Sequence, residues 1–259
     1  MSFLNGVRSK LSGLLEGIVP KDKIDEVLDL IQKKKEEELK KAPRIAIIGK
    51  TGVGKSSTIN SLFGTNLSFS HTEACTQEAT EIVLTNEKGE IIVLDMPGLG
   101  EDIERDKVHR KTYRKELPDC DIVLWILNID DREMSYQQTQ LKQIQKYCSS
   151  RLVICANKAD KMHPNDWLDD CNLPSEQQVE NLEKRITDIR EKLSKIVPIL
   201  SEDRIVYYSA TKRYRLDELF RAMMDACPDH RAWVLDDRKN LADFRELMHE
   251  DILKQYNSK

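Results

Sequence analysis

The sequence predicts an α/β fold with a doubly wound, mostly parallel sheet, and three observations support this prediction. From residue 44 onward, short apolar segments alternate with longer segments of helical periodicity. Residues 121–127 and 152–156 are continuous apolar runs, as expected for strands that are buried on both faces. Residues 81–84 and 91–94 flank a turn that ends in Gly89, so they predict one antiparallel hairpin.

The elements of this fold can be placed in chain order. We expect strands at 45–48, 81–84, 91–94, 121–127, 152–156 and 204–208. We expect helices at 56–63 and at about 103–116, 134–148, 176–196 and 215–226. Residues 65–78 are expected to form an exposed loop. The 259 residues suffice for one α/β domain at 44–226 with an appendage at each end.

Both appendages are predicted to be helical extensions. Within residues 1–43, apolar side chains at intervals of three and four predict an amphipathic helix before Pro20 and a second helix from about residue 22. We expect the first helix to dock on the globular domain; the alternative is that residues 1–20 contact a membrane surface or a partner. Residues 227–259 predict a single C-terminal helix at about 231–255, packed beside the N-terminal helices.

Composition limits the classes of function. The formal net charge is −4, so there is no general basic field and no strong nucleic-acid signal. The six cysteines form no C-x-x-C pair, which favours reduced, packed thiols in a reducing cytoplasm. No apolar stretch approaches the ~18 residues that a membrane span needs. The N-terminus does not resemble a secretory signal. We therefore expect a cytoplasmic protein, with peripheral membrane contact as the alternative.

Residues 49–56 carry the strongest functional signal. They read Gly-Lys-Thr-Gly-Val-Gly-Lys-Ser and follow a predicted strand, which is the pattern of a phosphate-binding loop. Its glycines let the backbone pass close to a polyphosphate with N–H groups toward the oxygens. Lys55 would place a cation on the outer phosphates, Ser56 would offer a hydroxyl to Mg²⁺, and the following helix would add its positive dipole end. The residues expected to bind the phosphates are Gly49, Lys50, Thr51, Gly52, Val53, Gly54, Lys55, Ser56 and Ser57.

The tetrapeptide Asp95-Met96-Pro97-Gly98 directly follows another predicted strand. An aspartate at such a strand end holds Mg²⁺, usually through water, and the backbone N–H of a nearby glycine can reach a terminal phosphate. This tetrapeptide is also a common turn, so it gains weight only together with the other motifs.

Two further loops point to guanine as the base. Asp160, in Asn157-Lys158-Ala159-Asp160, could accept both N1–H and the 2-amino group of guanine. Adenine lacks this pair of donors and would leave a desolvated Asp160 unpaired. The stem of Lys158 can cover the base, and Asn157 can tie this loop to the phosphate loop. In Ser209-Ala210-Thr211, a small residue would let a backbone N–H reach guanine O6.

With these four motifs in order, residues 44–226 resemble the translation-factor-like GTPases, most closely the Era-like branch and its YfjP-type bacterial members. They are also similar in style to the immunity-related and septin-like GTPases. The resemblance implies a Ras-like P-loop NTPase fold with a six-stranded sheet, one antiparallel strand and five surrounding helices. It also implies that GTP and Mg²⁺ bind, and that GTP is hydrolysed to GDP and phosphate.

The family's remaining element is a switch threonine that senses the γ-phosphate through Mg²⁺. The candidates are Thr72, Thr76 and Thr80. Thr76 lies nineteen residues before Asp95, which matches the Era-like spacing, so it ranks before Thr72, and Thr80 is expected in a strand. The resemblance thus gives Lys55, Thr76 and Gly98 as catalytic residues. It gives Ser56, Thr76 and Asp95 as metal ligands.

Two departures from the family pattern modify the expected chemistry. Leu99 stands where Ras-type proteins have the glutamine that positions water, so slow intrinsic turnover is expected. Gln77, beside Thr76, is a candidate for positioning the water instead. Gly52 stands where potassium-using members have asparagine, so no strong potassium activation is expected. Three arginines could donate charge across a dimer but are more simply solvated helix residues: Arg105, Arg110 and Arg114.

These observations favour a slow, GTP-dependent molecular switch whose effector is an unidentified protein. One alternative is a membrane-associated or self-assembling GTPase, which would dimerise through the switch face. Another is a GTP-binding scaffold with negligible turnover.

Overall fold

The computed structural model describes residues 14, 18–65, 79–99, 103–131, 134–198, 200–239 and 244. The chain divides into two compact units, residues 1–42 and 43–259. In the first unit a short 3-10 helix at Lys21–Lys23 leads into α2 (Ile24–Lys40), in agreement with the second predicted helix. Apart from Leu14 and Ile18, the predicted first helix lies outside the described residues.

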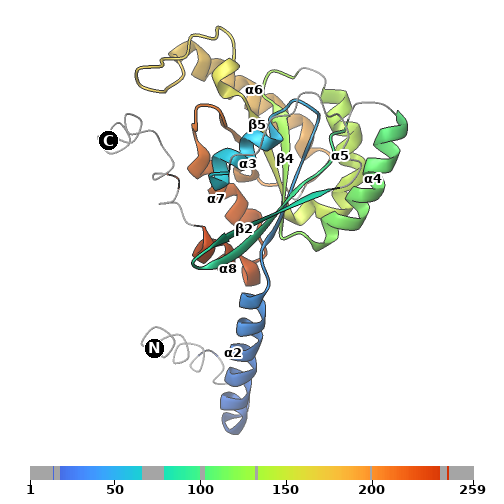
Figure 1. The fold of residues 1–259 in the computed structure, drawn as a ribbon, viewed down its shortest axis with the longest axis vertical. Coiled ribbons are helices and arrows are strands. Elements are labelled where there is room, and N and C mark those ends of the chain that lie inside the picture. Colours follow the sequence, from blue (N-terminus) through green and yellow to red (C-terminus); the bar gives the residue numbers. More distant parts are fainter. Residues whose placement is uncertain are drawn as a thin grey trace. The chain divides into compact units, whose positions relative to one another are not determined.

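The second unit is built on a six-stranded sheet (Figure 1). Its strands are β1 (Arg44–Gly49), β2 (Thr80–Asn86), β3 (Gly89–Asp95), β4 (Ile122–Asn128), β5 (Leu152–Asn157) and β6 (Ile205–Tyr207). The order is β2-β3-β1-β4-β5-β6, with β2 antiparallel to β3 and the other neighbours parallel. The predicted fold class is confirmed.

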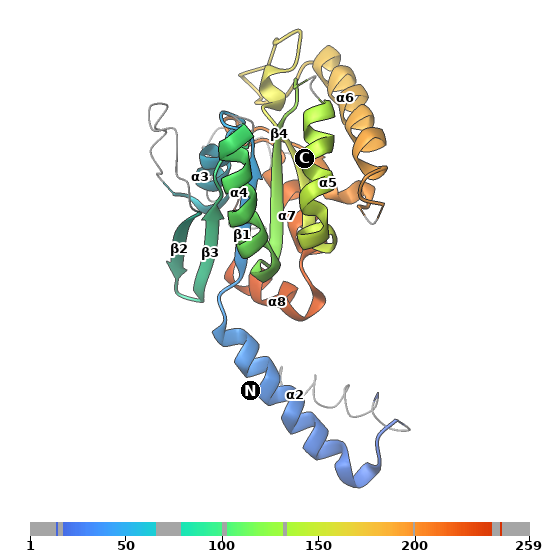
Figure 2. The same cartoon turned by 90° about the vertical axis from the view of Figure 1, so that its right-hand side faces the viewer.

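Helices cover both faces of this sheet. Figure 2 shows α4 and α5 side by side on one of these faces. The helices are α3 (Lys55–Phe63), α4 (Ile103–Glu116), α5 (Met134–Cys148), α6 (Glu176–Ser194), α7 (Leu216–Ala226) and α8 (Asp229–Arg238). Short 3-10 turns lie at Leu117–Asp119, Ser149–Arg151, Ala159–Lys161 and Glu202–Arg204. Among the described residues, no helix has the length and apolar character needed to cross a membrane.

The strands are apolar on both faces because each face has its own core. On β1, Ala46 and Ile48 pack with residues of α4, α5 and α6. The alternate residues Ile45 and Ile47 pack with residues of α3, α7 and α8. This two-layer burial explains why the central strands read as continuous apolar runs. The described cysteines are free thiols: Cys120, Cys148, Cys155, Cys171 and Cys227.

The C-terminal helix differs from the prediction in its length. Its start is close to the predicted one, but α8 ends at Arg238, and Lys239 has an extended backbone at φ −143° and ψ 120°. The helix end is held on the β2–β3 hairpin, because Asn86 Nδ2 donates to the Arg238 carbonyl at 2.8 Å. The α8 helix packs against β3 and α7 and lies in the same compact unit as the sheet. Residues 240–259, except for Phe244, lie outside the described part.

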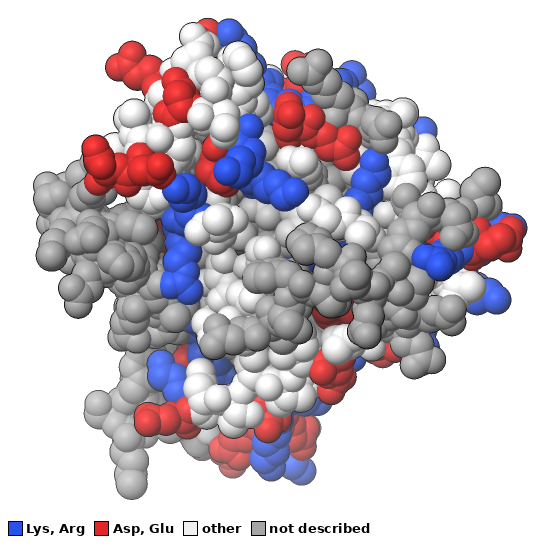
Figure 3. Space-filling view, turned by 45° about the horizontal axis from the view of Figure 1, so that its top comes forward, with Lys and Arg blue, Asp and Glu red and all other residues white. Residues whose placement is uncertain are grey.

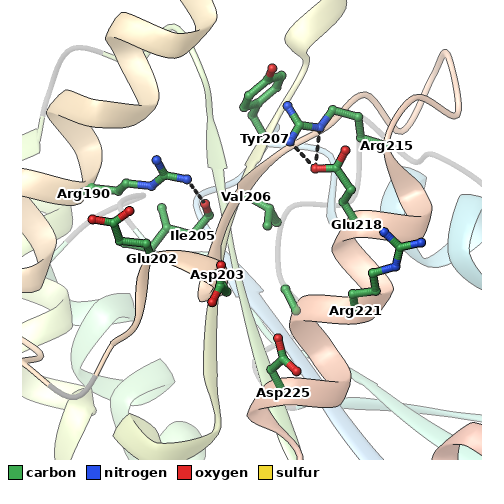
Figure 4. A pocket seen from close by; sticks show the side chains of 11 residues that line it. Arg190, Glu202, Asp203, Ile205, Val206, Tyr207, Arg215, Glu218, Arg221 and Asp225 are labelled. Atoms are coloured by element: carbon green, nitrogen blue, oxygen red, sulfur yellow. Dashed lines mark hydrogen bonds and ion pairs between the residues drawn. The ribbon is translucent and has the colours of Figure 1, made fainter.

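The outer edge of β6 is protected by charged side chains (Figure 4). A cleft of about 310 Å³ lies over this strand, between α6 and α7. Arg190 donates to the Ile205 carbonyl at 3.4 Å. Arg215 lies 3.8 Å over the Tyr207 ring and pairs with Glu218. Charges on an edge strand disfavour pairing with another chain, so this cleft has a structural explanation separate from the predicted nucleotide site.

Candidate nucleotide-binding site

The fold brings the four motifs to one edge of the sheet. The phosphate loop follows β1, Asp95 ends β3, Asn157 ends β5, and Ser209 comes two residues after β6. Because these strands are parallel, their carboxyl ends lie at the same edge, where α/β proteins place their ligands.

The phosphate loop needs its glycines for different reasons. Gly54 has φ +98°, and a Cβ there would lie 2.4 Å from Asn157 Nδ2. Gly52 has φ +80°, but a Cβ there would meet no atom within 4 Å. The α3 helix begins at Lys55, and no described side chain caps its N-terminus. Its first N–H groups are therefore available to an anion.

Asn157 joins three loops of the site. Its Nδ2 donates to the Val53 carbonyl of the phosphate loop at 3.0 Å. Its Oδ1 accepts from the backbone N–H of Lys158 at 2.7 Å and from that of Ala210 at 3.0 Å. Asn157 is only 2% exposed, so these hydrogen bonds are shielded from water. The tie to the phosphate loop that the sequence suggested is present.

The carboxylate of Asp160 is buried and oriented. It is 3% exposed, and its Oδ1 accepts from Ser209 Oγ at 2.5 Å. Its Oδ2 lies 3.6 Å from Lys161 Nζ. Ser209 is itself fully buried and also accepts from the Lys212 N–H at 3.0 Å. The sequence placed Ser209 at the base but did not show that its hydroxyl would orient Asp160.

Two details refine how a base would be held. Lys158 adopts φ +68°. Its Nζ donates to the Gly52 carbonyl at 2.8 Å, so its side chain connects the loop at 157–160 with the phosphate loop. The Ala210 N–H is engaged by Asn157 in this structure. Guanine O6 would therefore share this amide or take the amide of Thr211, which is exposed.

The metal side of the site centres on Asp95. Its Oδ1 is buried and has no hydrogen-bond partner among the described residues. Burial raises the pKa of Asp95, and the nearby charge of Lys55 opposes this effect. A buried carboxylate oxygen without a partner fits a water on Mg²⁺. In the described chain no cluster of three or more His, Cys, Asp or Glu side chains could hold a metal. A magnesium ion here would therefore rely on Ser56, phosphates and water as well.

Gly98 and Leu99 lie directly beside the phosphate loop. A Cβ on Gly98 would be 2.4 Å from Thr51 Oγ1, so only glycine allows this approach. The Leu99 N–H donates to the Gly49 carbonyl at 3.4 Å. The Leu99 side chain is 2% exposed and packs in the core.

The remaining candidate residues lie on β2 and α4 or outside the described residues. Thr72, Thr76 and Gln77 lie outside the described residues. Thr80 begins β2, as expected. Arg105 and Arg114 are exposed on α4, and Arg110 is half-buried. Figure 3 shows the molecule with the top of Figure 1 turned forward, and acidic and basic side chains are interspersed over the described surface in this view.

Sequence reasoning missed two buried residues of α4, His109 and Tyr113. Tyr113 Oη donates to the Pro97 carbonyl at 2.7 Å, and His109 Nδ1 lies 2.7 Å from the Gly98 carbonyl oxygen. A signal was present in the sequence, because the two residues are one turn apart on a helix that is otherwise highly charged.

The fold and the site together are those of a Ras-like P-loop NTPase domain. The family described as 50S ribosome-binding GTPase matches residues 44–158 of this chain. YkfA of Escherichia coli K12 is 33% identical over 159 residues, which are 61% of this chain and 54% of YkfA. YfjP of the same organism is 31% identical over the same shares. The chain thus spans about half the length of these curated relatives.

A solved structure has a similar fold. A structure of Era with MgGDPNP and a 16S ribosomal RNA fragment matches with a TM-score of 0.54 and 26% identity. The match covers 73% of this chain and 58% of that one.

Proposed function

We propose that this chain binds GTP and GDP with Mg²⁺ and hydrolyses GTP slowly to GDP and phosphate, as a nucleotide-dependent molecular switch. The observation that carries the proposal is the buried carboxylate of Asp160, held by Ser209. A desolvated carboxylate with free acceptor capacity favours the two-donor edge of guanine over adenine. Its loop is joined through Asn157 to the phosphate loop, so base and phosphates would be bound by one connected frame.

Each residue of the site has a distinct part in this proposal. Lys55 and the N–H groups at the start of α3 would stabilise negative charge on the phosphates. Ser56 and Asp95 would hold the Mg²⁺, with Thr76 as the proposed third ligand. When bound, Mg²⁺ would neutralise charge on the β- and γ-phosphates. Gly98 would donate its N–H to the γ-phosphate, and its lack of a side chain permits this close approach to Thr51.

Slow turnover follows from Leu99. Its side chain lies in the core and carries no hydrogen-bonding group, so it cannot orient the attacking water. Backbone groups, Mg²⁺ or a partner would have to supply that function. Phosphate release followed over hours, with Lys55→Ala as the blank, separates slow turnover from the negligible turnover of a pure scaffold.

The switch itself would consist of the segments near the γ-phosphate. Residues 65–78 and 96–112 would take different arrangements in the GTP and GDP forms. In this structure residues 103–112 already belong to α4, which contacts the Gly98 segment. The effector would be a protein that binds only the GTP form. A homodimer through this face is the self-assembling variant of the proposal, and size-exclusion chromatography with GDP and with a GTP analogue distinguishes the two.

The direct test uses two substitutions. Lys55→Ala should abolish nucleotide binding, because the cation on the outer phosphates is lost. Asp160→Asn should shift preference from guanine to xanthine nucleotides, because the amide can donate to the xanthine 2-oxo group. Lys184→Ala, on an exposed lysine of α6, is the matched control and should bind like the wild type. Full GTP affinity in both site variants would refute the proposal.

Membrane association is the second candidate, and the exposed apolar side chains of the first unit favour it. Leu14 is 69% exposed and Ile18 is 80% exposed. Flotation with anionic liposomes, in GTP and in GDP, tests this candidate. Binding that is lost in the Leu14→Ser, Ile18→Ser double variant, but kept in Leu30→Ser, would support it. Absence of wild-type binding in both nucleotide states would exclude it.

A further inference from the structure

Helix α4 contacts two consecutive carbonyl groups of the segment that follows β3. Tyr113 donates to the Pro97 carbonyl and His109 contacts the Gly98 carbonyl, both at 2.7 Å. Tyr113 is fully buried and His109 is 2% exposed. Two buried hydrogen bonds to adjacent peptides restrict their rotation far more than one exposed bond would.

The geometry of the peptide bond turns these contacts into a statement about Gly98. In a planar trans peptide the C=O and the N–H point in opposite directions. The carbonyl of Pro97 and the N–H of Gly98 belong to the same peptide. By holding the carbonyl, Tyr113 therefore fixes the direction of the Gly98 N–H.

The following peptide is held at both of its ends. Its carbonyl, from Gly98, contacts His109, and its N–H, from Leu99, donates to the Gly49 carbonyl at 3.4 Å. Both peptide planes that flank the Gly98 Cα are therefore fixed. The same Cα lies against Thr51 of the phosphate loop.

Both side chains can act as donors. Burial, with smaller contributions from Tyr136, Asp95 and Asp106, raises the pKa of Tyr113 well above its ordinary value, so the hydroxyl keeps its proton. The Gly98 carbonyl can only accept, so His109 Nδ1 carries the proton in this contact. The Nε2 atom of His109 is buried without a partner among the described residues.

The helix that provides these donors is itself anchored. Asp106, one turn before His109 on α4, accepts from Tyr136 Oη at 3.2 Å and from Gln140 Nε2 at 3.5 Å, both on α5. Lys50 of the phosphate loop lies 4.5 Å over the Tyr136 ring. A continuous set of contacts thus connects the phosphate loop, α5, α4 and the Gly98 peptide.

We propose that Tyr113 and His109 are positioning residues that hold the Gly98 N–H toward the γ-phosphate and so set the preference for GTP over GDP. This inference rests on the proposed function. GDP has no γ-phosphate and makes no use of the Gly98 N–H. Loss of either donor therefore weakens binding of the triphosphate and leaves binding of the diphosphate unchanged.

The first test is Tyr113→Phe, which removes only the hydroxyl. Affinities for GDP and for an imido analogue of GTP are measured with Mg²⁺ by fluorescence of labelled nucleotides. We expect the analogue to lose about threefold to tenfold in affinity, the worth of one hydrogen bond, and GDP to stay within twofold. Tyr207→Phe is the matched control, because its hydroxyl donates at 2.8 Å to Glu183, on α6.

The second test separates the donor of His109 from its bulk. His109→Asn keeps an N–H at the δ position and should retain the analogue-to-GDP affinity ratio. His109→Gln moves the N–H to the ε position, and His109→Leu removes it, so both should lower the ratio. A purely structural role would instead order the three variants by melting temperature, without changing the ratio.

The outcomes distinguish this inference from the proposed function. If the wild type binds no guanine nucleotide, the proposed function fails and this inference fails with it. If the wild type binds both nucleotides but Tyr113→Phe keeps the wild-type ratio, only this inference is overturned. Should Tyr113→Phe not fold, as judged by circular dichroism, the His109 series decides: equal ratios in Asn, Gln and Leu would overturn it.

Discussion

Asn157 is the residue on which the connection between base and phosphates depends. One amide side chain links Val53, Lys158 and Ala210, which come from three different loops. Asn157→Ala would remove the partner of the Val53 carbonyl and of the Lys158 and Ala210 N–H groups, at a cost of about 1–3 kcal/mol for each group left buried and unpaired. We expect GTP and GDP affinities to fall together by at least about tenfold, since the interaction concerns both nucleotides.

Isothermal titration calorimetry with each nucleotide checks this prediction. The control is Asn181→Ala, which removes an exposed bond of 2.8 Å to the His163 carbonyl. A loss of affinity restricted to GTP would mean that Asn157 acts only when the γ-phosphate is bound. It would then not serve as a general link between the guanine-binding loop and the phosphate loop.

The glycines of the phosphate loop provide a matched pair. Gly54→Ala would place a Cβ against Asn157 Nδ2, whereas the same change at Gly52 meets open space. Both positions have positive φ, so alanine costs about 1–2 kcal/mol of strain at either one. We expect Gly54→Ala to lose nucleotide binding and Gly52→Ala to bind within about tenfold of wild type. Equal loss in both variants, measured by fluorescent GDP titration, would contradict a steric role for Gly54.

Asp95 should destabilise the protein when no metal is bound. Burial raises its pKa, and Lys55 compensates only in part. When the folded state raises the pKa of a carboxyl group, the free energy of unfolding of the protein falls as pH rises toward neutrality. The reason is that the charged form is disfavoured in the folded state. Asp95→Asn removes this charge and should stabilise the apo protein at pH 7 by about 1 kcal/mol.

The expected signature is a melting temperature higher by about 2–4 °C in EDTA, together with weaker Mg²⁺-dependent binding of GTP. A lower melting temperature in EDTA would show that ionised Asp95 is already well paired without metal.

At the residue scale the sequence was informative wherever a motif has fixed spacing. The glycines, Lys55, Asp95, Asn157 and Asp160 were found because each follows a strand in a set order. Ser209 as a partner of Asp160, and Tyr113 and His109 as partners of the Gly98 segment, were not predicted. Those contacts depend on how α4 and the last loop pack, which spacing along the chain does not encode.

At the scale of elements, α8 lies in the same compact unit as the sheet. Arg231 of α8 is 4% exposed and its Nε pairs with Asp121 Oδ1 at 3.1 Å. Asp121 also accepts from the Arg44 N–H at 2.9 Å, so this ion pair fixes the start of β1. Arg231→Ala would remove the ion-pair partner of the largely buried Asp121 carboxylate and leave its hydrogen bond with the Arg44 N–H. This change should cost about 2 kcal/mol of folding stability.

Urea unfolding followed by circular dichroism measures this loss. Arg221→Ala is the control, because Arg221 is 63% exposed and lies 3.8 Å from Asp217; it should change stability by less than about 0.5 kcal/mol. A similarly small effect of Arg231→Ala would mean that α8 is not held through Asp121.

Strands and central helices were predicted well because buried runs and helical periodicity are local signals. Helices α4 and α5 have the predicted bounds, and α6 begins with a capping box of Ser175 and Gln178. The C-terminal helix was predicted as continuous, whereas α8 ends at Arg238, whose carbonyl accepts from Asn86 on a distant hairpin. Its apolar stripe indicated burial but could not say against which element.

At the scale of the whole molecule, all described parts of the proposed nucleotide site lie in the unit 43–259. Four of the six strands place the four motifs at one edge of the sheet, and the family match over residues 44–158 covers the first three of these motifs at least in part. The chain spans about half the length of its curated relatives.

The central claim is that this site selects guanine nucleotides, and calorimetric titration of the full chain with GTP, GDP and ATP in Mg²⁺ tests it most directly. We predict that GTP and GDP bind and that ATP binds at least about a hundredfold more weakly, because adenine cannot donate to Asp160. Xanthosine triphosphate should replace GTP as the preferred ligand of Asp160→Asn. Equal affinity for ATP and GTP, or no binding of either, would contradict the account.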